Sequence, residues 1–132
     1  MIALSGPVQL FTVIALVSLP TVMFGGYSLL GLLRKRKLSA EQHAWFRAGH
    51  AHAGVLLVLA LVTLQFVAAG GLGTAAQWVV CVLLLIGTLT QSGGLFLHLA
   101  PSRKALAHGV TVGGAVLLAA ALITTAVGVA VA

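Results

Sequence analysis

Four long apolar segments, separated by short stretches that hold almost all of the charge, dominate this 132-residue sequence. They run over about residues 8–33, 48–69, 76–100 and 105–132. Each is long enough to cross a membrane, because a hydrocarbon core of about 30 Å requires roughly 20 helical residues. A transmembrane barrel would alternate polar and apolar positions, whereas these segments are apolar all round. The sequence therefore predicts an all-α fold, a four-helix transmembrane bundle.

The composition excludes a soluble domain. Hydrophobic residues make up 61% of the chain and charged residues 6%, whereas about a quarter of a soluble domain is charged. A chain of this size has too small an interior to bury so much apolar surface, so lipid must cover the remainder. We expect one membrane domain over residues 1–132, with helices at about residues 7–34, 40–69, 75–100 and 103–131.

Short motifs mark the expected helix boundaries. Ser5-Gly6-Pro7 is typical of a first helical turn, and Ser39 to Gln42 has the spacing of a capping box, which makes the second helix the longest. Glycines at residues 70, 71 and 73 interrupt the chain, as does Pro101-Ser102, where Ser102 is a candidate cap. Both connections are short, which predicts antiparallel neighbours in an up-and-down topology.

The basic residues predict the orientation. All seven fall in or beside the first and third connections, and the single acidic residue is Glu41; the basic residues are Arg34, Lys35, Arg36, Lys37, Arg47, Arg103 and Lys104. Under the positive-inside rule, this pattern predicts a multi-pass plasma membrane protein with these connections in the cytoplasm and both termini outside. The run at residues 34–37 favours contact with anionic lipid headgroups. Nothing indicates a nucleic-acid-binding face.

The histidines are the residues that most need a functional explanation. The topology brings all five to the cytoplasmic end of the bundle, although they are spread along the sequence: His43, His50, His52, His98 and His108. His50, His98 and His108 lie at similar depth and can be neighbours. His50 and His52 point about 200° apart, so only one of them can face a small ligand in the interior.

Two stripes of residues predict which helix faces meet. His43, Arg47, His50 and Gly54 follow one face of the second helix. Gly87, Gln91, Gly94 and His98 follow one face of the third, and we expect the two stripes to oppose each other. Thr88 and Gln91 continue the polar line deeper into the membrane, where polar side chains usually turn inward.

Three explanations of this cluster remain open. In the first, His50, His98 and His108 bind a transition metal (copper, zinc or iron) or, with His52 as an alternative ligand, a haem, because imidazole is a common ligand in bundle interiors. Arg47 would hold a haem propionate or another anion, or extend to the headgroups. In the second, His43, Thr88 and Gln91 line the polar cavity of a small channel or carrier. In the third, the chain is a non-catalytic structural or assembly subunit.

Catalysis by the chain alone is not expected. The sequence has no hydrolase elbow, phosphate-binding loop or paired carboxylates, so it lacks a recognisable nucleophile and base. Glu41 cannot supply a carboxylate-bridged di-iron site by itself.

The string Gly49-His50-Ala51-His52-Ala53-Gly54, with His98 at the end of a glycine-containing helix, resembles the small four-helix relatives of the haem-copper oxidase catalytic subunit. The resemblance covers about half of the chain. It implies ligation of haem or copper by His50 or His52 together with His98. It does not extend to oxygen reduction, because the sequence lacks a tandem histidine pair and a tyrosine beside a histidine.

Two further features concern packing. Pro20 removes a backbone donor in mid-helix and predicts a kink, with Ser18 or Thr21 available to bond the freed groups. Ala105, Gly109 and Gly113 form a seam of small residues, which predicts close contact with another helix. That helix belongs to this chain, to another membrane subunit or to a second copy in a homo-oligomer.

Overall fold

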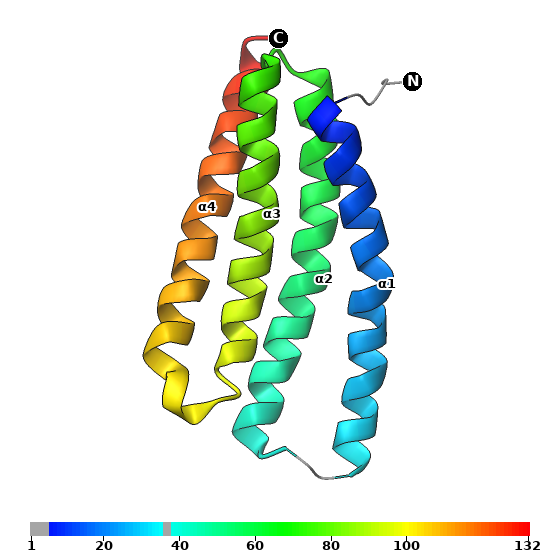
Figure 1. Cartoon of the computed structure of the whole chain (residues 1–132), viewed down its shortest axis with the longest axis vertical. Helices are drawn as coiled ribbons and strands as arrows, with labels where there is room; N and C mark the ends of the chain where they lie inside the picture. The colour runs from blue at the N-terminus through cyan, green and yellow to red at the C-terminus, as the bar shows by residue number, and fades with distance from the viewer. Residues whose placement is uncertain (1–5, 36–37) are drawn as a thin grey trace.

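The computed structural model describes residues 6–35 and 38–132, and these residues form four long helices. The helices are α1 (Gly6–Arg34), α2 (Ala40–Ala69), α3 (Thr74–Leu97) and α4 (Lys104–Ala130), with a 3₁₀ turn, η1 (Pro101–Arg103), before α4. The described residues contain no strand. All four helices are long and apolar enough to cross a membrane, so the predicted all-α four-helix bundle is confirmed (Figure 1).

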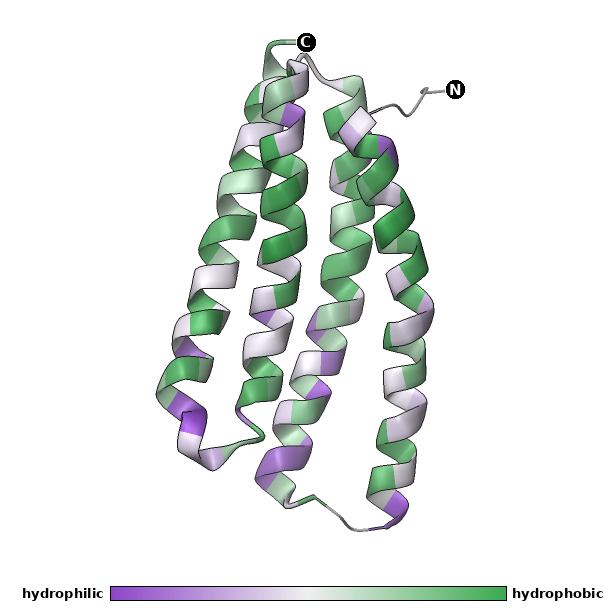
Figure 2. Cartoon of the chain, in the orientation of Figure 1, coloured by the Kyte–Doolittle hydropathy of each residue, from purple (hydrophilic) through white to green (hydrophobic). Residues whose placement is uncertain are grey.

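Successive helices run in opposite directions along the bundle (Figure 1). The start of α1, the α2–α3 connection and the C-terminus lie at one end. We call the opposite end, which carries residues 34–35, 38–47 and 98–108, the basic end. Figure 2 shows that hydrophilic residues gather there, while the helices above it are predominantly apolar. The closest pairing is between α3 and α4, and α1 packs on α2 and, less extensively, on α3.

The capping box predicted at the start of α2 is confirmed. The backbone amide of Gln42 donates to the hydroxyl of Ser39 at 3.2 Å, and the backbone amide of Ser39 donates to the side-chain oxygen of Gln42 at 3.0 Å. These reciprocal bonds satisfy two amides that a helix start otherwise leaves unpaired. At 30 residues, α2 is the longest helix described, as predicted.

Glycines bring α3 and α4 almost to backbone contact. A Cβ atom added at Gly87 would lie 2.8 Å from Cγ of Leu118, and one at Gly94 would lie 2.6 Å from the backbone nitrogen of Thr111. In the other direction, a Cβ atom at Gly114 would lie 2.7 Å from Cα of Gln91. Larger residues at these positions would separate the helices, so this pairing depends on small side chains.

The beginning of α4 differs from the prediction. Ser102 is not its cap, because Pro101 opens the 3₁₀ turn and Ser102 lies inside that turn. The cap position is Arg103, which makes no side-chain capping bond. In addition, α3 ends at Leu97, so His98 caps its C-terminus instead of lying within the helix. Ser5, the expected cap of the first helix, lies outside the described residues.

The seam of Ala105, Gly109 and Gly113 meets no other helix within the described residues. All three residues are exposed, and Cβ atoms added at the two glycines would have no described neighbour within 4 Å. The face of α4 that meets α3 instead includes Gly114 and Leu118. Of the partners that the sequence left open for this seam, the described helices of this chain are therefore not the one, and contact with a second copy stays a prediction.

Candidate functional site

The histidine stripe of α2 faces α1, not α3. A Cβ atom added at Gly26 would lie 2.8 Å from Nε2 of His50, and one at Gly54 would lie 3.9 Å from Cγ1 of Val22. The imidazole of His50 thus occupies the space that the absent side chains of Gly25 and Gly26 leave open. On α3, Gly87, Gln91 and Gly94 pack against α4, and His98 is the one member of that stripe with a described contact to α2. The prediction that the two stripes face each other was therefore wrong.

His98 contacts α2 through an aromatic stack. Its ring lies 4.0 Å from the ring of Trp45, centroid to centroid, with an interplanar angle of 11°. One layer deeper, Phe46 and Phe96 pack edge to face at 5.3 Å. Nδ1 of His98 is buried and has no hydrogen-bond partner among the described residues. This histidine therefore contributes to the packing of α2 on α3 and retains one unused ring nitrogen.

The remaining histidines have separate surroundings. His52 is exposed, and its Nδ1 lies 2.9 Å from the carbonyl oxygen of Ala48 on the same helix. His108 is exposed on α4. His43 is half-buried, and its Nε2 has no partner in residues 6–35 and 38–132. The candidate anion ligand Arg47 is exposed.

A metal site is not found in the part of the chain that the structure describes. There, no three or more His, Cys, Asp or Glu side chains form a group that could hold a metal ion. The set predicted from His50, His98 and His108 is accordingly not assembled. His50 packs on α1, while His98 packs on Trp45 of α2. Similar depth along the bundle did not bring these side chains together, because His50 contacts α1, His98 contacts α2 and His108 is exposed on α4.

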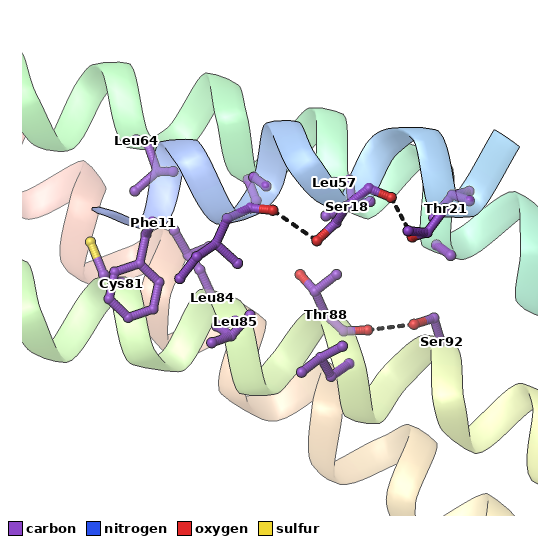
Figure 3. Close-up of a pocket in the computed structure, with 16 residues that line it drawn as sticks. Phe11, Ser18, Thr21, Leu57, Leu64, Cys81, Leu84, Leu85, Thr88 and Ser92 are labelled. Atoms are coloured by element: carbon purple, nitrogen blue, oxygen red, sulfur yellow. Dashed lines mark hydrogen bonds between the residues drawn. The ribbon is translucent and has the colours of Figure 1, made fainter. Parts of the chain in front are cut away.

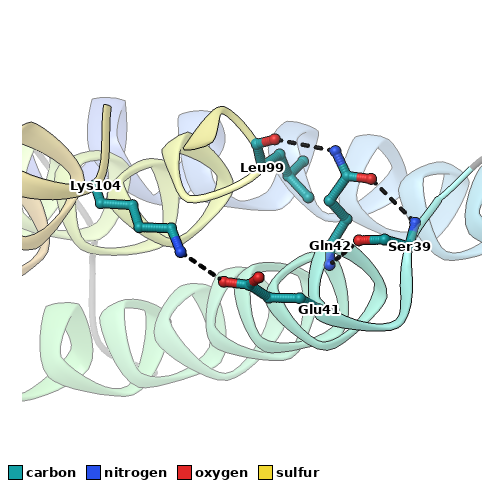
Figure 4. A network of polar contacts seen from close by, with 5 residues as sticks. All are labelled: Ser39, Glu41, Gln42, Leu99 and Lys104. Carbon is teal, nitrogen blue, oxygen red and sulfur yellow. Dashed lines mark hydrogen bonds and ion pairs between the residues drawn. The ribbon is translucent and has the colours of Figure 1, made fainter. Parts of the chain in front are cut away.

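Polar contacts at the basic end connect α2 to the α3–α4 connection (Figure 4). The side-chain nitrogen of Gln42 donates to the carbonyl oxygen of Leu99 at 3.2 Å. Nζ of Lys104 lies 2.9 Å from Oε1 of Glu41, and both side chains are more than half exposed. The hydrogen bond from Gln42 holds the start of α2 against the end of α3, whereas the exposed ion pair contributes little to stability, and neither contact forms a reactive site.

A cavity of about 170 Å³ lies between α1, α2 and α3 (Figure 3). Its lining is predominantly apolar, with hydroxyl groups contributed by α1 and α3. The lining residues are Phe11, Ile14, Ala15, Ser18, Thr21, Val22, Ala53, Leu57, Ala60, Leu64, Cys81, Leu84, Leu85, Thr88, Leu89 and Ser92. A largely apolar pocket with a few polar groups is the usual form of a small-molecule site.

The hydroxyl of Thr88 is the unusual group in this lining. Thr88 is only 5% exposed, and its Oγ1 has no hydrogen-bond partner among the described residues. Ser92, one turn away, donates to the carbonyl oxygen of Thr88 at 2.6 Å and is satisfied. In Figure 3 the Thr88 hydroxyl points into the cavity on the side of Ser18. A buried hydroxyl without a partner costs about 1–3 kcal/mol, so a ligand or water that bonds to it would be stabilising.

The other side of the cavity is built around Pro20 of α1. The hydroxyl of Ser18 donates to the carbonyl oxygen of Ile14 at 2.8 Å, and that of Thr21 donates to the carbonyl oxygen of Ser18 at 2.6 Å. Neither bonds the carbonyl of Leu16, whose usual helical donor Pro20 lacks. Both hydroxyls border the cavity, and their oxygens keep lone pairs that can accept a further bond.

Two of the residues that line the cavity reach the surface of the bundle. Thr21 on α1 and Leu89 on α3 are exposed, whereas the other lining residues are buried or half-buried. Both lie within helices that are long and apolar enough to cross a membrane.

One of the three residues that the sequence assigned to a polar cavity lies in this lining. Thr88 borders the cavity, whereas His43 and Gln91, the other two residues assigned to a polar cavity, are not among its lining residues. The backbone of Gln91 instead packs against Gly114. Ser18 and Thr21 were considered only as partners of the Pro20 kink. The i, i+4 spacing of Thr88 and Ser92 is the sequence signal that could have extended the polar line along α3.

The four spans define a multi-pass membrane protein. Comparison with known proteins adds no family: no family model matches the chain, and no curated protein or solved structure matches it. The cavity and the histidine positions are therefore the features from which a function can be argued.

Proposed function

We propose that this chain is a membrane-embedded binding protein that takes a small, mostly apolar molecule from the bilayer into the cavity between α1, α2 and α3. The observation that carries the proposal is the buried, unpartnered hydroxyl of Thr88 beside a cavity of about 170 Å³. Native interiors contain few voids larger than a water molecule, and their buried polar atoms are nearly always paired. A cavity and an unpaired donor at one place are best explained by a missing partner.

The character of the lining supports an uncharged ligand. Six of the lining residues come from α1, four from α2 and six from α3, and none of them is acidic, basic or histidine. A charged group in this position would have no counterion, and burial of an unpaired charge is strongly unfavourable. Thr21 and Leu89 line the cavity and reach the surface of apolar helices of membrane-spanning length, which supports entry of a lipid-soluble molecule at these residues.

Binding of 4-fluorotoluene to the full chain in detergent micelles or nanodiscs, followed by ¹⁹F NMR, tests the proposal. We expect a distinct bound signal for the native protein. Ala60→Leu adds a bulky side chain to the lining and should abolish that signal, whereas Ala119→Leu, on the exposed face of α4, should leave it unchanged. A native protein without a bound signal, or an Ala60→Leu variant that binds equally well, would contradict the proposal.

Haem or transition-metal binding at the basic end is a second candidate. Its support is that two imidazole nitrogens, Nε2 of His43 and Nδ1 of His98, are each buried without a partner in the described residues. The resemblance of residues 49–54 to relatives of the haem-copper oxidase subunit points the same way. A bound haem or copper would supply electron transfer or ligand binding. An optical spectrum with metal analysis of the purified protein, compared with that of His98→Ala, tests this candidate: a stoichiometric cofactor lost in the variant supports it.

A further inference from the structure

We infer that the molecule bound in the cavity carries one neutral hydroxyl group on a body about the size of a single ring, as a phenol does. Thr88 donates a hydrogen bond to that hydroxyl, and Ser18 accepts one from it. This inference rests on the proposed function and specifies the chemical class of the ligand.

The hydrogen-bond donors and acceptors of the cavity lining indicate that the polar group of the ligand is a hydroxyl. Three of the four hydroxyl side chains in the lining already donate to backbone carbonyls: Ser18 to Ile14, Thr21 to Ser18 and Ser92 to Thr88. Each of these oxygens can still accept a bond but has no free proton. The Thr88 hydroxyl is the one hydroxyl donor left in the lining, and the thiol of Cys81 is only a weak donor. The four hydroxyl groups of the lining thus offer one free donor and several acceptors. An alcohol or phenol can accept a bond from the donor and donate one to an acceptor.

Other neutral ligand groups satisfy fewer of the hydrogen-bonding groups in the lining. A ketone or ether accepts the bond from Thr88 but leaves the Ser18 oxygen without a donor. A hydrocarbon leaves the Thr88 proton unpaired as well. Unmet buried groups of this kind produce strong discrimination between ligands that differ by one polar atom.

The volume of the cavity limits the size of the ligand group that it can enclose. An apolar cavity of about 150 Å³ in another protein binds benzene, so about 170 Å³ accommodates one ring with a small substituent. Phe11, Leu64 and Leu84 are buried and supply an apolar floor for such a ring. We expect an alkyl tail on the ring to extend past the exposed lining residues Thr21 and Leu89 into the surrounding lipid.

The test compares 4-fluorophenol with 4-fluorotoluene and 4-fluoroanisole by ¹⁹F NMR titration of the full chain. Thr88→Val removes the hydroxyl and keeps the shape, and we expect it to weaken 4-fluorophenol about five- to tenfold, the effect of one net hydrogen bond. It should leave 4-fluorotoluene unchanged or slightly tighter. Ser18→Ala should weaken 4-fluorophenol but not 4-fluoroanisole, which has no proton to donate.

Matched variants keep the result interpretable. Thr90→Val removes a hydroxyl that donates to the Ile86 carbonyl outside the lining, and it should not alter binding. Thr88→Ser retains the donor and should bind 4-fluorophenol as the native protein does, even if Thr88→Val fails to fold. Equal phenol affinity in the native protein and in Thr88→Val, or loss of affinity in Thr88→Ser, overturns the inference. If 4-fluorotoluene still binds in that case, the proposed function survives; if no probe binds the native protein, the proposed function itself fails.

Discussion

Gln42 and Leu99 are joined by a hydrogen bond although they lie 57 residues apart in the sequence. The amide group of Gln42 serves two structures at once: its oxygen accepts from the Ser39 backbone in the capping box, and its nitrogen donates to the Leu99 carbonyl at 3.2 Å. The start of α2 and the end of α3 are therefore held by one side chain (Figure 4).

The double role of Gln42 predicts a clear loss of stability. We expect Gln42→Ala to lower the free energy of unfolding by about 1–2 kcal/mol, because it removes half of a capping box and one tertiary hydrogen bond. Chemical or thermal unfolding in detergent measures this change. The neighbouring Glu41→Gln serves as the control and should have no measurable effect, since its ion pair with Lys104 is exposed. A Gln42→Ala variant as stable as the native protein would show that the Gln42 contacts do not stabilise the bundle.

Two adjacent glycines of α4 provide a matched pair for the packing of α3 on α4. Gly114→Ala places a Cβ atom 2.7 Å from Cα of Gln91 and should destabilise the protein by about 1–3 kcal/mol. Gly113→Ala meets no described atom within 4 Å and should leave stability unchanged or raise it by up to about 1 kcal/mol. Unfolding measurements on both variants decide the point, and the reverse order would refute this helix pairing.

How far the sequence predicts this protein follows from the physics of lipid as a solvent. The helices were predictable because only helices satisfy the backbone of long apolar segments in a bilayer, and the capping box located the start of α2. The helix faces were not predictable. In lipid an apolar side chain is equally suited to the surface and the interior, so hydrophobic pattern does not orient a helix.

The histidine stripe of α2 is an example of a helix face whose neighbour could not be predicted from the sequence. The residues His43, His50 and Gly54 were correctly grouped on one face of α2, but nothing in their chemistry favoured α3 over α1 as the neighbour. His50 packs against α1 at Gly25 and Gly26, where the absence of side chains leaves room for its ring. Thr88 could be recognised as an unusual polar residue in an apolar segment. The cavity beside it could not, because it depends on which helix lies opposite.

The contact of His50 with α1 gives a prediction about the role of this histidine. Gly26→Ala should destabilise the protein, because the new Cβ atom would lie 2.8 Å from Nε2 of His50. His50→Ala should remove that conflict, so the double variant should be more stable than the sum of the two single effects. Gly31→Ala is the control, since a Cβ atom there has no described neighbour within 4 Å. Purely additive unfolding free energies would show that the His50 ring does not pack over Gly26.

The basic end predicts the orientation of the protein in the membrane. Because Arg34, Lys35, Arg103 and Lys104 lie together at that end, we expect it to face the cytoplasm and the α2–α3 connection to face outward. A membrane-impermeant maleimide applied to intact cells should label Gly73→Cys but not Ser102→Cys, and both should react after the cells are opened. The native Cys81 is buried and should give little background. Labelling of Ser102→Cys alone in intact cells would reverse the assignment and place the basic end outside.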